Sequence, residues 1–501
     1  MRLATLVDGS DVRRVAGSLD VDVTGVAIDS RRVAPGDVFF ALAGAHTDGR
    51  RHVAEALARG ARAIVGTGPI EAPGTVTVLE SARPRAVLAC AAARLAGDPS
   101  AAMTLVGVTG TNGKTTTTYL VEGIWRAAGH ATGVIGTIAY RFGAEARTAP
   151  LTTPEAPEIQ GLLAEMQRGG ITHAVMEVSS IALAQERAAA LRFDAAVFTN
   201  LTLDHLDFHG DMAAYEVAKR RLFLELLPAG GKPDPVAVVN VDDAAGARLA
   251  AAVRTRRVTF GRTPAAEVRP EDVESTLAGT RGTLVLGGRR LPFASALVGA
   301  PHVENIAAAA ATAWALGVDD EAIAAGIAAT APPPGRVERL AGPGFTVVVD
   351  YAHTPDALER LLDAMRPLTP GALITVFGCG GDRDRRKRPV MGEAAARRSD
   401  VVILTSDNPR TEDPAGILAD IEPGIRKGGL APLAGSTGTG RGYRVEPDRP
   451  RAIDLAIDLA QPGDLVVVAG KGHEDYQIVG AVKHHLDDRE EVRRALARRG
   501  A

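Results

Sequence analysis

The sequence predicts an α/β fold divided into three domains, and three observations support this. Short apolar runs alternate with helical stretches along most of the chain. The 501 residues are too many for one core, since a domain usually holds about 100–200 residues. Two seams rich in proline and glycine, residues 97–100 and 331–335, interrupt the pattern. We therefore expect domains over residues 1–98, 99–334 and 335–501.

The first domain is predicted to be a small α/β unit. An apolar strand is expected over residues 37–42, followed by a helical pattern around residues 53–57 and a second strand at residues 63–65.

The middle domain is predicted to hold a mostly parallel sheet that is covered on both faces. Its apolar runs have the length of buried strands and alternate with helical sequence. They lie at residues 103–108, 173–178, 195–199 and 236–240.

The last domain repeats this style and is predicted to be Rossmann-like. Strands are expected at residues 346–350, 373–377, 401–405 and 465–469. The glycine-rich stretch 428–443 is expected to be a surface loop.

Composition excludes several classes of function. Lys and Arg number 57 against 60 Asp and Glu, so no basic excess favours nucleic-acid binding. No signal peptide or long apolar segment is visible, and we expect a cytoplasmic protein without membrane insertion. With only Cys90 and Cys379, the chain has no disulfide framework and no thiolate-rich metal site.

The most informative motif follows the apolar run at 103–108 and leads into helical sequence. Glycines at 107, 110 and 113 allow backbone N–H groups to surround phosphate oxygens, and Lys114 adds a charge for the β- and γ-phosphates. The Thr115 hydroxyl can bind Mg²⁺. An ordinary glycine-rich turn is the alternative, because Val108 stands where the common motif has its first glycine. The motif predicts ATP binding.

Polar residues follow almost every predicted strand of the last two domains, which predicts one site between two sheets. Glu177 and His205 stand at such ends and could hold Mg²⁺ beside the γ-phosphate. A salt-bridge glutamate and an ordinary loop histidine are the alternatives.

In the last domain, Arg410 follows Pro409 in a stiff turn, which suits bidentate capture of a carboxylate. A solvated loop arginine remains the alternative. The stretch 470–474 contains Lys471 followed by glycine, so it lacks the hydroxyl that a second nucleotide site would need. The charged run 382–388 is a solvated loop or a binding segment.

Taken in order, these motifs resemble the Mur ligases, ATP-dependent enzymes of peptidoglycan precursor synthesis. The resemblance runs from end to end, and Asp29–Asp37 is similar to that family's N-terminal UDP-binding domain. It rests further on Gly110–Thr115, Asn200–His205, Tyr215–Phe223, Asp350–Pro355, Asp407–Arg410 and Gly470–Glu474. One departure is Ile181, where many members carry histidine.

The resemblance implies a monomeric ligase that adds meso-diaminopimelate to UDP-N-acetylmuramoyl-L-alanyl-D-glutamate through an acyl phosphate. It implies that Lys219 is carbamylated by CO₂ and joins Thr115, Glu177 and His205 around Mg²⁺, and that Lys114, Lys219, His205 and Glu177 form the catalytic set. ATP would be held by Gly110, Thr111, Asn112, Gly113, Lys114, Thr115, Thr116, Asn305, Arg336 and Asp350. The UDP-linked dipeptide would be held by Ser30, Thr152, Thr153, Ser179, Gln185 and Arg187, and diaminopimelate by Arg388, Asp407, Asn408, Arg410, Gly470 and Glu474.

Three alternatives stay open at this point. The chain could be a Mur-ligase paralogue that adds a different amino acid, or a ligase of the folylpolyglutamate-synthetase type. From another class, it could be a non-catalytic ATP-binding scaffold. Arg410 and the N-terminal similarity disfavour the first two, and the intact residues Lys114, Glu177 and Lys219 disfavour the third.

Overall fold

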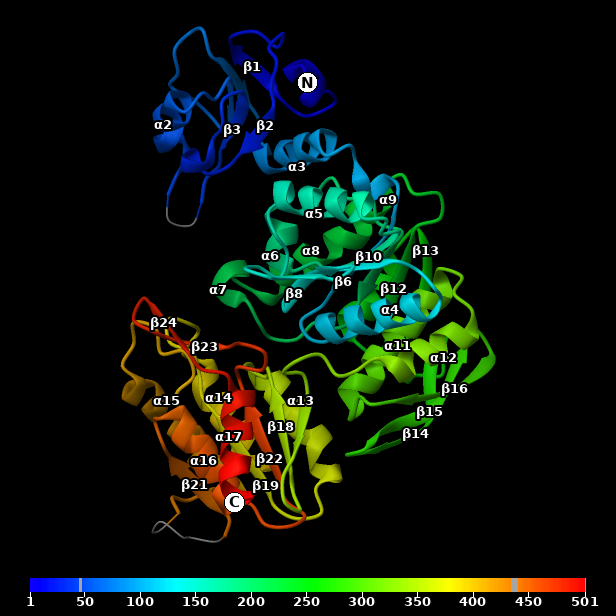
Figure 1. Ribbon diagram of the computed structural model, residues 1–501, viewed down its shortest axis with the longest axis vertical. Coiled ribbons are helices and arrows are strands. Elements are labelled where there is room, and N and C mark those ends of the chain that lie inside the picture. Colours follow the sequence, from blue (N-terminus) through cyan, green and yellow to red (C-terminus); the bar gives the residue numbers. More distant parts are fainter. Residues whose placement is uncertain (45–46, 434–439, 501) are drawn as a thin grey trace.

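The computed structural model describes residues 1–44, 47–433 and 440–500. Three α/β regions follow one another along the longest axis, from the N-terminal region at one end to the C-terminal region at the other (Figure 1). The predicted α/β class is therefore confirmed. Of the expected surface loop at 428–443, residues 434–439 lie outside the described residues, and its end is wrong, because Gly442 and Tyr443 are buried in a parallel strand.

The N-terminal region contains a five-stranded sheet in the order β1-β5-β4-β3-β2. Its central strands are fully buried because apolar residues occupy both faces. Its strands are β1 (Arg13–Ala16), β2 (Gly25–Ala27), β3 (Asp37–Ala41), β4 (Ala63–Gly66) and β5 (Thr77–Glu80), and its helices are α1 (Leu3–Leu6), α2 (Val53–Ala58) and α3 (Pro84–Leu95). Helix α3 also packs against α5 (Ala156–Arg168) of the middle region.

The middle region is built on an eleven-stranded sheet in the order β16-β15-β14-β13-β12-β11-β6-β10-β7-β8-β9. Its centre, from β13 to β7, is parallel, as predicted, whereas both ends are antiparallel hairpins that the sequence reading missed. The strands are β6 (Thr104–Thr109), β7 (Thr132–Ile135), β8 (Ala139–Phe142), β9 (Glu145–Thr148), β10 (His173–Glu177), β11 (Ala195–Phe198), β12 (Val236–Asn240), β13 (Arg256–Phe260), β14 (Val268–Thr276), β15 (Gly279–Leu286) and β16 (Arg289–Ser295).

Helices pack on both faces of this sheet and form two hydrophobic cores. One core lies under α4 and α11 and contains Trp125, and the other contains Phe193 and Phe223. The remaining helices are α4 (Lys114–Ala127), α6 (Ser180–Ala184), α7 (Leu206–His209), α8 (Met212–Arg221), α9 (Leu227–Ala229), α10 (Ala244–Ala252), α11 (Ala300–Ala315) and α12 (Asp320–Ala329), with a π-helical turn at Leu222–Leu226.

The C-terminal region has a six-stranded sheet in the order β17-β18-β22-β19-β20-β21, parallel except for β17, with a separate hairpin of β23 and β24. The strands are β17 (Glu338–Ala341), β18 (Thr346–Asp350), β19 (Leu373–Phe377), β20 (Val401–Leu404), β21 (Gly442–Val445), β22 (Leu465–Ala469), β23 (Tyr476–Val479) and β24 (Val482–His485). The helices are α13 (Pro355–Met365), α14 (Lys387–Arg398), α15 (Pro414–Lys427), α16 (Arg449–Leu459) and α17 (Asp488–Gly500).

These positions confirm the strands expected in the last two regions to within a residue at each end. Within the described ranges, no helix has both the length and the apolar character needed to cross a bilayer.

Candidate active site

The phosphate-binding loop lies between β6 and α4, where the backbone passes very close to its neighbours. Gly113 has a φ of +87°, and a Cβ there would lie 2.3 Å from Asn305 Oδ1. A Cβ on Gly110 would lie 1.8 Å from Thr199 Oγ1. Both positions therefore require glycine. The loop ends at the N-terminus of α4, where free N–H groups and the helix dipole favour a bound anion.

Lys114 is folded back over its own loop. Its Nζ donates hydrogen bonds to the carbonyl oxygens of Gly110 and Thr111, each at 2.9 Å. Burial lowers the pKa of the Lys114 ammonium, and the nearby Glu177 carboxylate opposes this shift. The charge is thus held at the phosphate loop.

Glu177, at the end of β10, is 1% exposed and adjoins this loop. Thr115 Oγ1 donates to Glu177 Oε1 at 3.0 Å. Thr137 contacts both carboxylate oxygens, through its N–H at 2.9 Å and its hydroxyl at 2.9 Å. Thr137 also lies 3.0 Å from Thr152 through their hydroxyl oxygens. The sequence reading missed Thr137, because no motif surrounds it.

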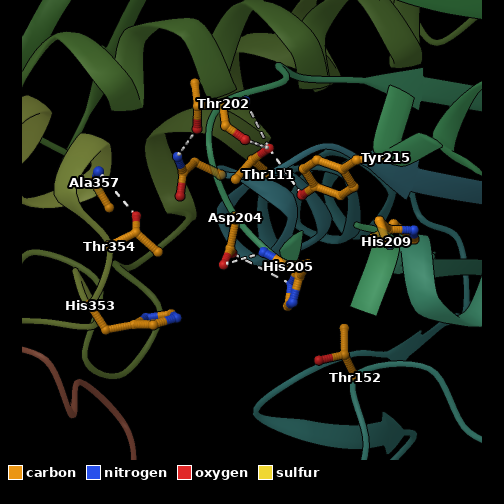
Figure 2. Close-up of polar contacts among 12 residues, drawn as sticks. Thr111, Thr152, Thr202, Asp204, His205, His209, Tyr215, His353, Thr354 and Ala357 are labelled. Carbon is orange, nitrogen blue, oxygen red and sulfur yellow. Dashed lines mark hydrogen bonds and ion pairs between the residues drawn. The ribbon is translucent and has the colours of Figure 1, made fainter. Parts of the chain in front are cut away.

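His205 and Lys219 both lie within range of the Lys114 charge. His205 Nε2 is 3.5 Å from a carboxylate oxygen of Asp204, and burial lowers the pKa of His205. Figure 2 shows Asp204, His205, His353 and Thr152 around the same open space, and all four line the cavity described below. Asp204 and His353 lie within the motifs Asn200–His205 and Asp350–Pro355, but the sequence assigned no role to either of them.

Lys219 is almost completely buried on α8, with 1% of its surface exposed. Its ammonium lies 4.5 Å from the centre of the Tyr215 ring. Burial is the main reason that its pKa falls well below the ordinary lysine value, and the Lys114 charge adds to the shift. A neutral amine at this position is the form that can react with CO₂.

The proposed metal ligands are only partly assembled by protein atoms. Thr115 and Glu177 are in contact, and these oxygen donors suit Mg²⁺. His205 and the amine of Lys219 approach from α7 and α8. Among the described residues, no group of three or more His, Cys, Asp or Glu side chains could hold a metal ion. A further anionic ligand, such as a carbamate, would complete the set.

The C-terminal region closes the far side of the nucleotide site. Arg336 Nη2 lies 3.4 Å from Thr115 Oγ1, and its guanidinium stacks 4.5 Å from the Tyr351 ring. The buried Arg336 Nε has no hydrogen-bond partner within the described residues. Asp350 accepts hydrogen bonds from the N–H groups of Val337 and Ala352. The phosphate-loop residue Asn112 also donates to Asp356 of α13 at 3.1 Å.

Most of these groups line one cavity of about 360 Å³, a size typical of small-molecule sites. Lys219 and Asp356 are not among the residues that line it. The cavity contains members of the predicted ATP, metal and dipeptide sets. They are Thr111, Asn112, Gly113, Lys114, Thr115, Thr116, Asn305, Arg336, Asp350, Glu177, His205, Thr152, Thr153, Ser179 and Arg187, together with Ile181.

The predicted dipeptide residues of the middle region form one hydrogen-bonded group. Thr153 Oγ1 donates to the Glu177 carbonyl oxygen at 2.9 Å and accepts from the Ser179 N–H at 3.0 Å. Arg187 donates to the Thr153 carbonyl oxygen and to the side chain of Gln185. Ser30 lies apart from this group, in the N-terminal region, where its hydroxyl donates to Glu55 at 2.6 Å.

The predicted diaminopimelate residues gather at the ends of β20 and β22. Asn408 Nδ2 donates to Glu474 at 3.1 Å. The ammonium of Lys471, which sequence reading left unassigned, is completely buried and lies 3.6 Å from both Asp407 and Glu474. Burial, followed by the Asp407 charge, raises the pKa of Glu474. Gly470 lies beside Asp407, since a Cβ on Gly470 would be 3.6 Å from Asp407 Oδ2.

Arg388 is placed differently from the others. It is 1% exposed, and its terminal nitrogens donate to Glu412, Asp420 and the Gly380 carbonyl oxygen. Arg383 is exposed in the loop before α14, and a Cβ on Gly380 would lie 2.9 Å from Arg410 Nη1 and 3.8 Å from Arg383 Cγ. Arg383 is thus a second arginine near Arg410. The sequence left a binding role open for the charged run 382–388 but did not single out Arg383 within it.

Comparison with known families covers nearly the whole chain. Residues 22–100 match the model described as Mur ligase family, catalytic domain. Residues 108–313 match the Mur ligase middle domain, and residues 335–472 match the Mur ligase, glutamate ligase domain.

Individual relatives agree. The UDP-N-acetylmuramoyl-L-alanyl-D-glutamate–2,6-diaminopimelate ligase of Geobacter metallireducens is 48% identical, over 99% of this chain and 98% of that protein. The protein of the same name from Geobacillus kaustophilus is 43% identical over the full length of both. A solved structure with this name superposes with a TM-score of 0.71 at 32% identity, covering 100% of this chain and 99% of that one. A folylpolyglutamate synthase of Mycobacterium tuberculosis, with a TM-score of 0.60 at 20% identity over 77% of this chain and 92% of that one, shares the fold.

Proposed function

The chain belongs to the Mur ligase family, and we propose that it joins meso-diaminopimelate to UDP-N-acetylmuramoyl-L-alanyl-D-glutamate with ATP, in peptidoglycan precursor synthesis. One observation carries this proposal: the phosphate loop, the dipeptide group and Arg336 line the same cavity. The names of the full-length relatives supply the substrates. The three domains at 1–98, 99–334 and 335–501, the monomeric state and the cytoplasmic location are part of the same proposal.

The residues of the cavity suit a two-step reaction. The free glutamyl carboxylate attacks the γ-phosphorus of ATP, which forms an acyl phosphate and releases ADP. Lys114 neutralises the transferring phosphoryl group, and Arg336, with its unpaired Nε, adds a second charge. The amine of diaminopimelate then attacks the acyl carbon, inorganic phosphate leaves, and an amide forms.

The donors at Thr115 and Glu177, with His205 and a carbamate on Lys219, would hold Mg²⁺. When bound, the ion would supply charge neutralisation at the phosphates. In this proposal Thr137 orients the Glu177 carboxylate by donating to both of its oxygens. The dipeptide would lie along Thr152, Thr153, Ser179, Gln185 and Arg187, with its uridine end near Ser30.

The amino-acid site would be selective because of its arginines. Asp407 and Glu474 would attract an ammonium, and Arg410 would bind the distal carboxylate that distinguishes diaminopimelate from lysine. Since the terminal nitrogens of Arg388 already bind Glu412 and Asp420, we assign Arg388 to shaping the loop. Arg383, exposed beside Gly380, is the better second partner for the carboxylate.

The test is a product assay. ADP should appear at full rate only when the muramoyl dipeptide and diaminopimelate are both present, and mass spectrometry should show the tripeptide product. ADP release that is independent of both substrates would favour a non-catalytic or unrelated ATP-binding role. Equal use of another amino acid would favour the alternative that the chain is a Mur-ligase paralogue with a different amino-acid substrate.

A further inference from the structure

The hairpin of β23 and β24 stands outside the six-stranded sheet and covers the loop that carries Arg410. Both the N–H and the carbonyl oxygen of Arg410 form hydrogen bonds with the backbone of this hairpin. The Arg410 N–H donates to the Ile478 carbonyl oxygen at 3.0 Å, and the Gly480 N–H donates to the Arg410 carbonyl oxygen at 2.7 Å. Arg410 therefore pairs with Val479 in a parallel bridge, as an added strand would.

Two side-chain contacts extend this pairing to the start of the loop. Gln477 Nε2 donates to the Asp407 carbonyl oxygen at 2.7 Å. The Ile478 N–H donates to Asn408 Oδ1 at 2.9 Å. Asn408 Oδ1 also accepts from Lys471 Nζ at 3.2 Å, and its Nδ2 donates to Glu474. The Asn408 side chain is thus occupied with protein partners, so its role is to connect the hairpin to the site.

The Arg410 backbone needs such support. Its φ of +54° lies in the left-handed region, which is unfavourable for any residue except glycine. Such a conformation persists when surrounding contacts fix it. Here the contacts are the two backbone bonds to the hairpin and the bond from Arg410 Nη1 to the Gly381 carbonyl oxygen at 2.7 Å.

We propose that the β23–β24 hairpin sets the amino-acid preference of the enzyme, and that Gln477 is the positioning residue that fixes the Asp407–Arg410 loop on it. This inference rests on the proposed function, since it concerns how the diaminopimelate site is aimed. Gln477 acts through the loop and need not touch the substrate. A change at Gln477 should therefore alter selection between amino acids and leave ATP use unaffected.

The opposite strand of the hairpin provides a matched control. His484 pairs directly with Gln477 across the hairpin, and it is exposed on β24. His484→Ala removes a side chain of similar size from the same hairpin but none of the contacts to the loop. A purely structural role of the hairpin would make the two variants alike.

The experiment measures kcat/KM for diaminopimelate and for lysine, KM for ATP, and the melting temperature. In Gln477→Ala, kcat/KM for diaminopimelate should fall about tenfold, the value expected for one lost hydrogen bond in a positioned site, while the lysine value changes little. Gln477→Glu places a carboxylate near the Asp407 carbonyl oxygen. This variant should lower the ratio of kcat/KM for diaminopimelate to kcat/KM for lysine further than Gln477→Ala does. KM for ATP should match the wild-type value in both Gln477 variants. The His484→Ala enzyme should match wild type in every one of these measurements.

A double variant separates positioning from general loosening. In an Arg410→Ala background, Gln477→Ala should no longer change the ratio of the two amino acids, since the group being aimed is gone. An unchanged ratio in both Gln477 variants, or an equal change with and without Arg410, overturns the inference. If wild type itself uses lysine as well as diaminopimelate, the proposed function fails instead.

Discussion

The buried basic side chains on the two sides of the site differ in whether a carboxylate pairs with them. In the middle region, Lys114 donates only to loop carbonyl oxygens, and Lys219 has an aromatic ring beside it but no hydrogen bond or ion pair among the described residues. In the C-terminal region, Arg388 is held by two carboxylates, and Arg449 pairs with Asp488 with neither side chain exposed.

This difference distinguishes basic side chains that bind a ligand from those that hold neighbouring loops in place. A buried cation without an anion is costly, so the Lys114 ammonium indicates an anion that arrives from outside, such as a phosphate. At Lys219 burial favours the neutral amine instead, which could become an anion by reacting with CO₂. A buried cation with its carboxylate in place holds neighbouring loops. Arg449 does so visibly, because it also donates to the carbonyl oxygens of Ser406 and Ala469, the residues that precede Asp407 and Gly470.

The largest effect should come from the C-terminal side, where Arg410, like Arg336, has no ion pair with a carboxylate among the described residues. Its guanidinium donates to a carbonyl oxygen and is only partly buried. A site built around such a group rejects an analogue without its partner by roughly 10⁴. Arg410→Ala should therefore collapse the ratio of kcat/KM between diaminopimelate and lysine, measured by steady-state assay. A ratio equal to that of wild type would show that discrimination lies elsewhere.

The next effect tests the unpaired lysine of the phosphate loop. Lys114→Ala should lose about 3–4 kcal/mol of transition-state stabilisation, which is a hundredfold to a thousandfold in rate. The loss should appear in kcat with every amino acid, unlike the Arg410 effect. Thr118→Ser serves as the control, because it lies on the same helix and keeps the hydroxyl that donates to the Thr115 carbonyl oxygen at 2.8 Å. Near-normal turnover of Lys114→Ala would contradict the assignment.

The sequence was sufficient to predict most of the buried parallel strands and the residues at their ends, but not the parallel strands β7, β13 and β21. It was insufficient for the outer hairpins, because Glu145–Thr148 is fully exposed and has no apolar run, and β14 contains Pro270 and several charges. Thr137 and Gln477 were missed for a different reason. Their roles depend on distant partners, Glu177 and Asp407, which only the folded chain brings within hydrogen-bonding distance.

A third, smaller effect concerns the carbamate on Lys219. Because burial lowers the pKa of Lys219 well below the ordinary lysine value, more of its amine is in the neutral form that reacts with CO₂. Lys219→Ala should lose about a hundredfold in activity, and short carboxylic acids should restore part of it. Carbon NMR after addition of labelled bicarbonate should show a carbamate signal in wild type and none in the variant. Full activity of Lys219→Ala in carbonate-depleted buffer would exclude the role.

The smallest effect is a pH dependence that should separate the two regions. Burial and the neighbouring Asp407 raise the pKa of Glu474, whereas Lys471, Asn408 and Tyr351 also face it. Its negative charge is therefore present above the raised pKa and is lost as the pH falls through that value. We expect KM for diaminopimelate to rise by up to about tenfold per pH unit below it, since each unit removes that fraction of the charged form. The amino acid's own carboxylates titrate lower and its amines higher, so they do not produce this limb. Glu474→Gln should bind diaminopimelate more weakly but lose this pH dependence, whereas KM for ATP, at a site where burial raises the pKa of Asp350, should keep its wild-type pH profile. If Glu474→Gln keeps the wild-type pH profile of KM for diaminopimelate, then the acid limb belongs to a group other than Glu474.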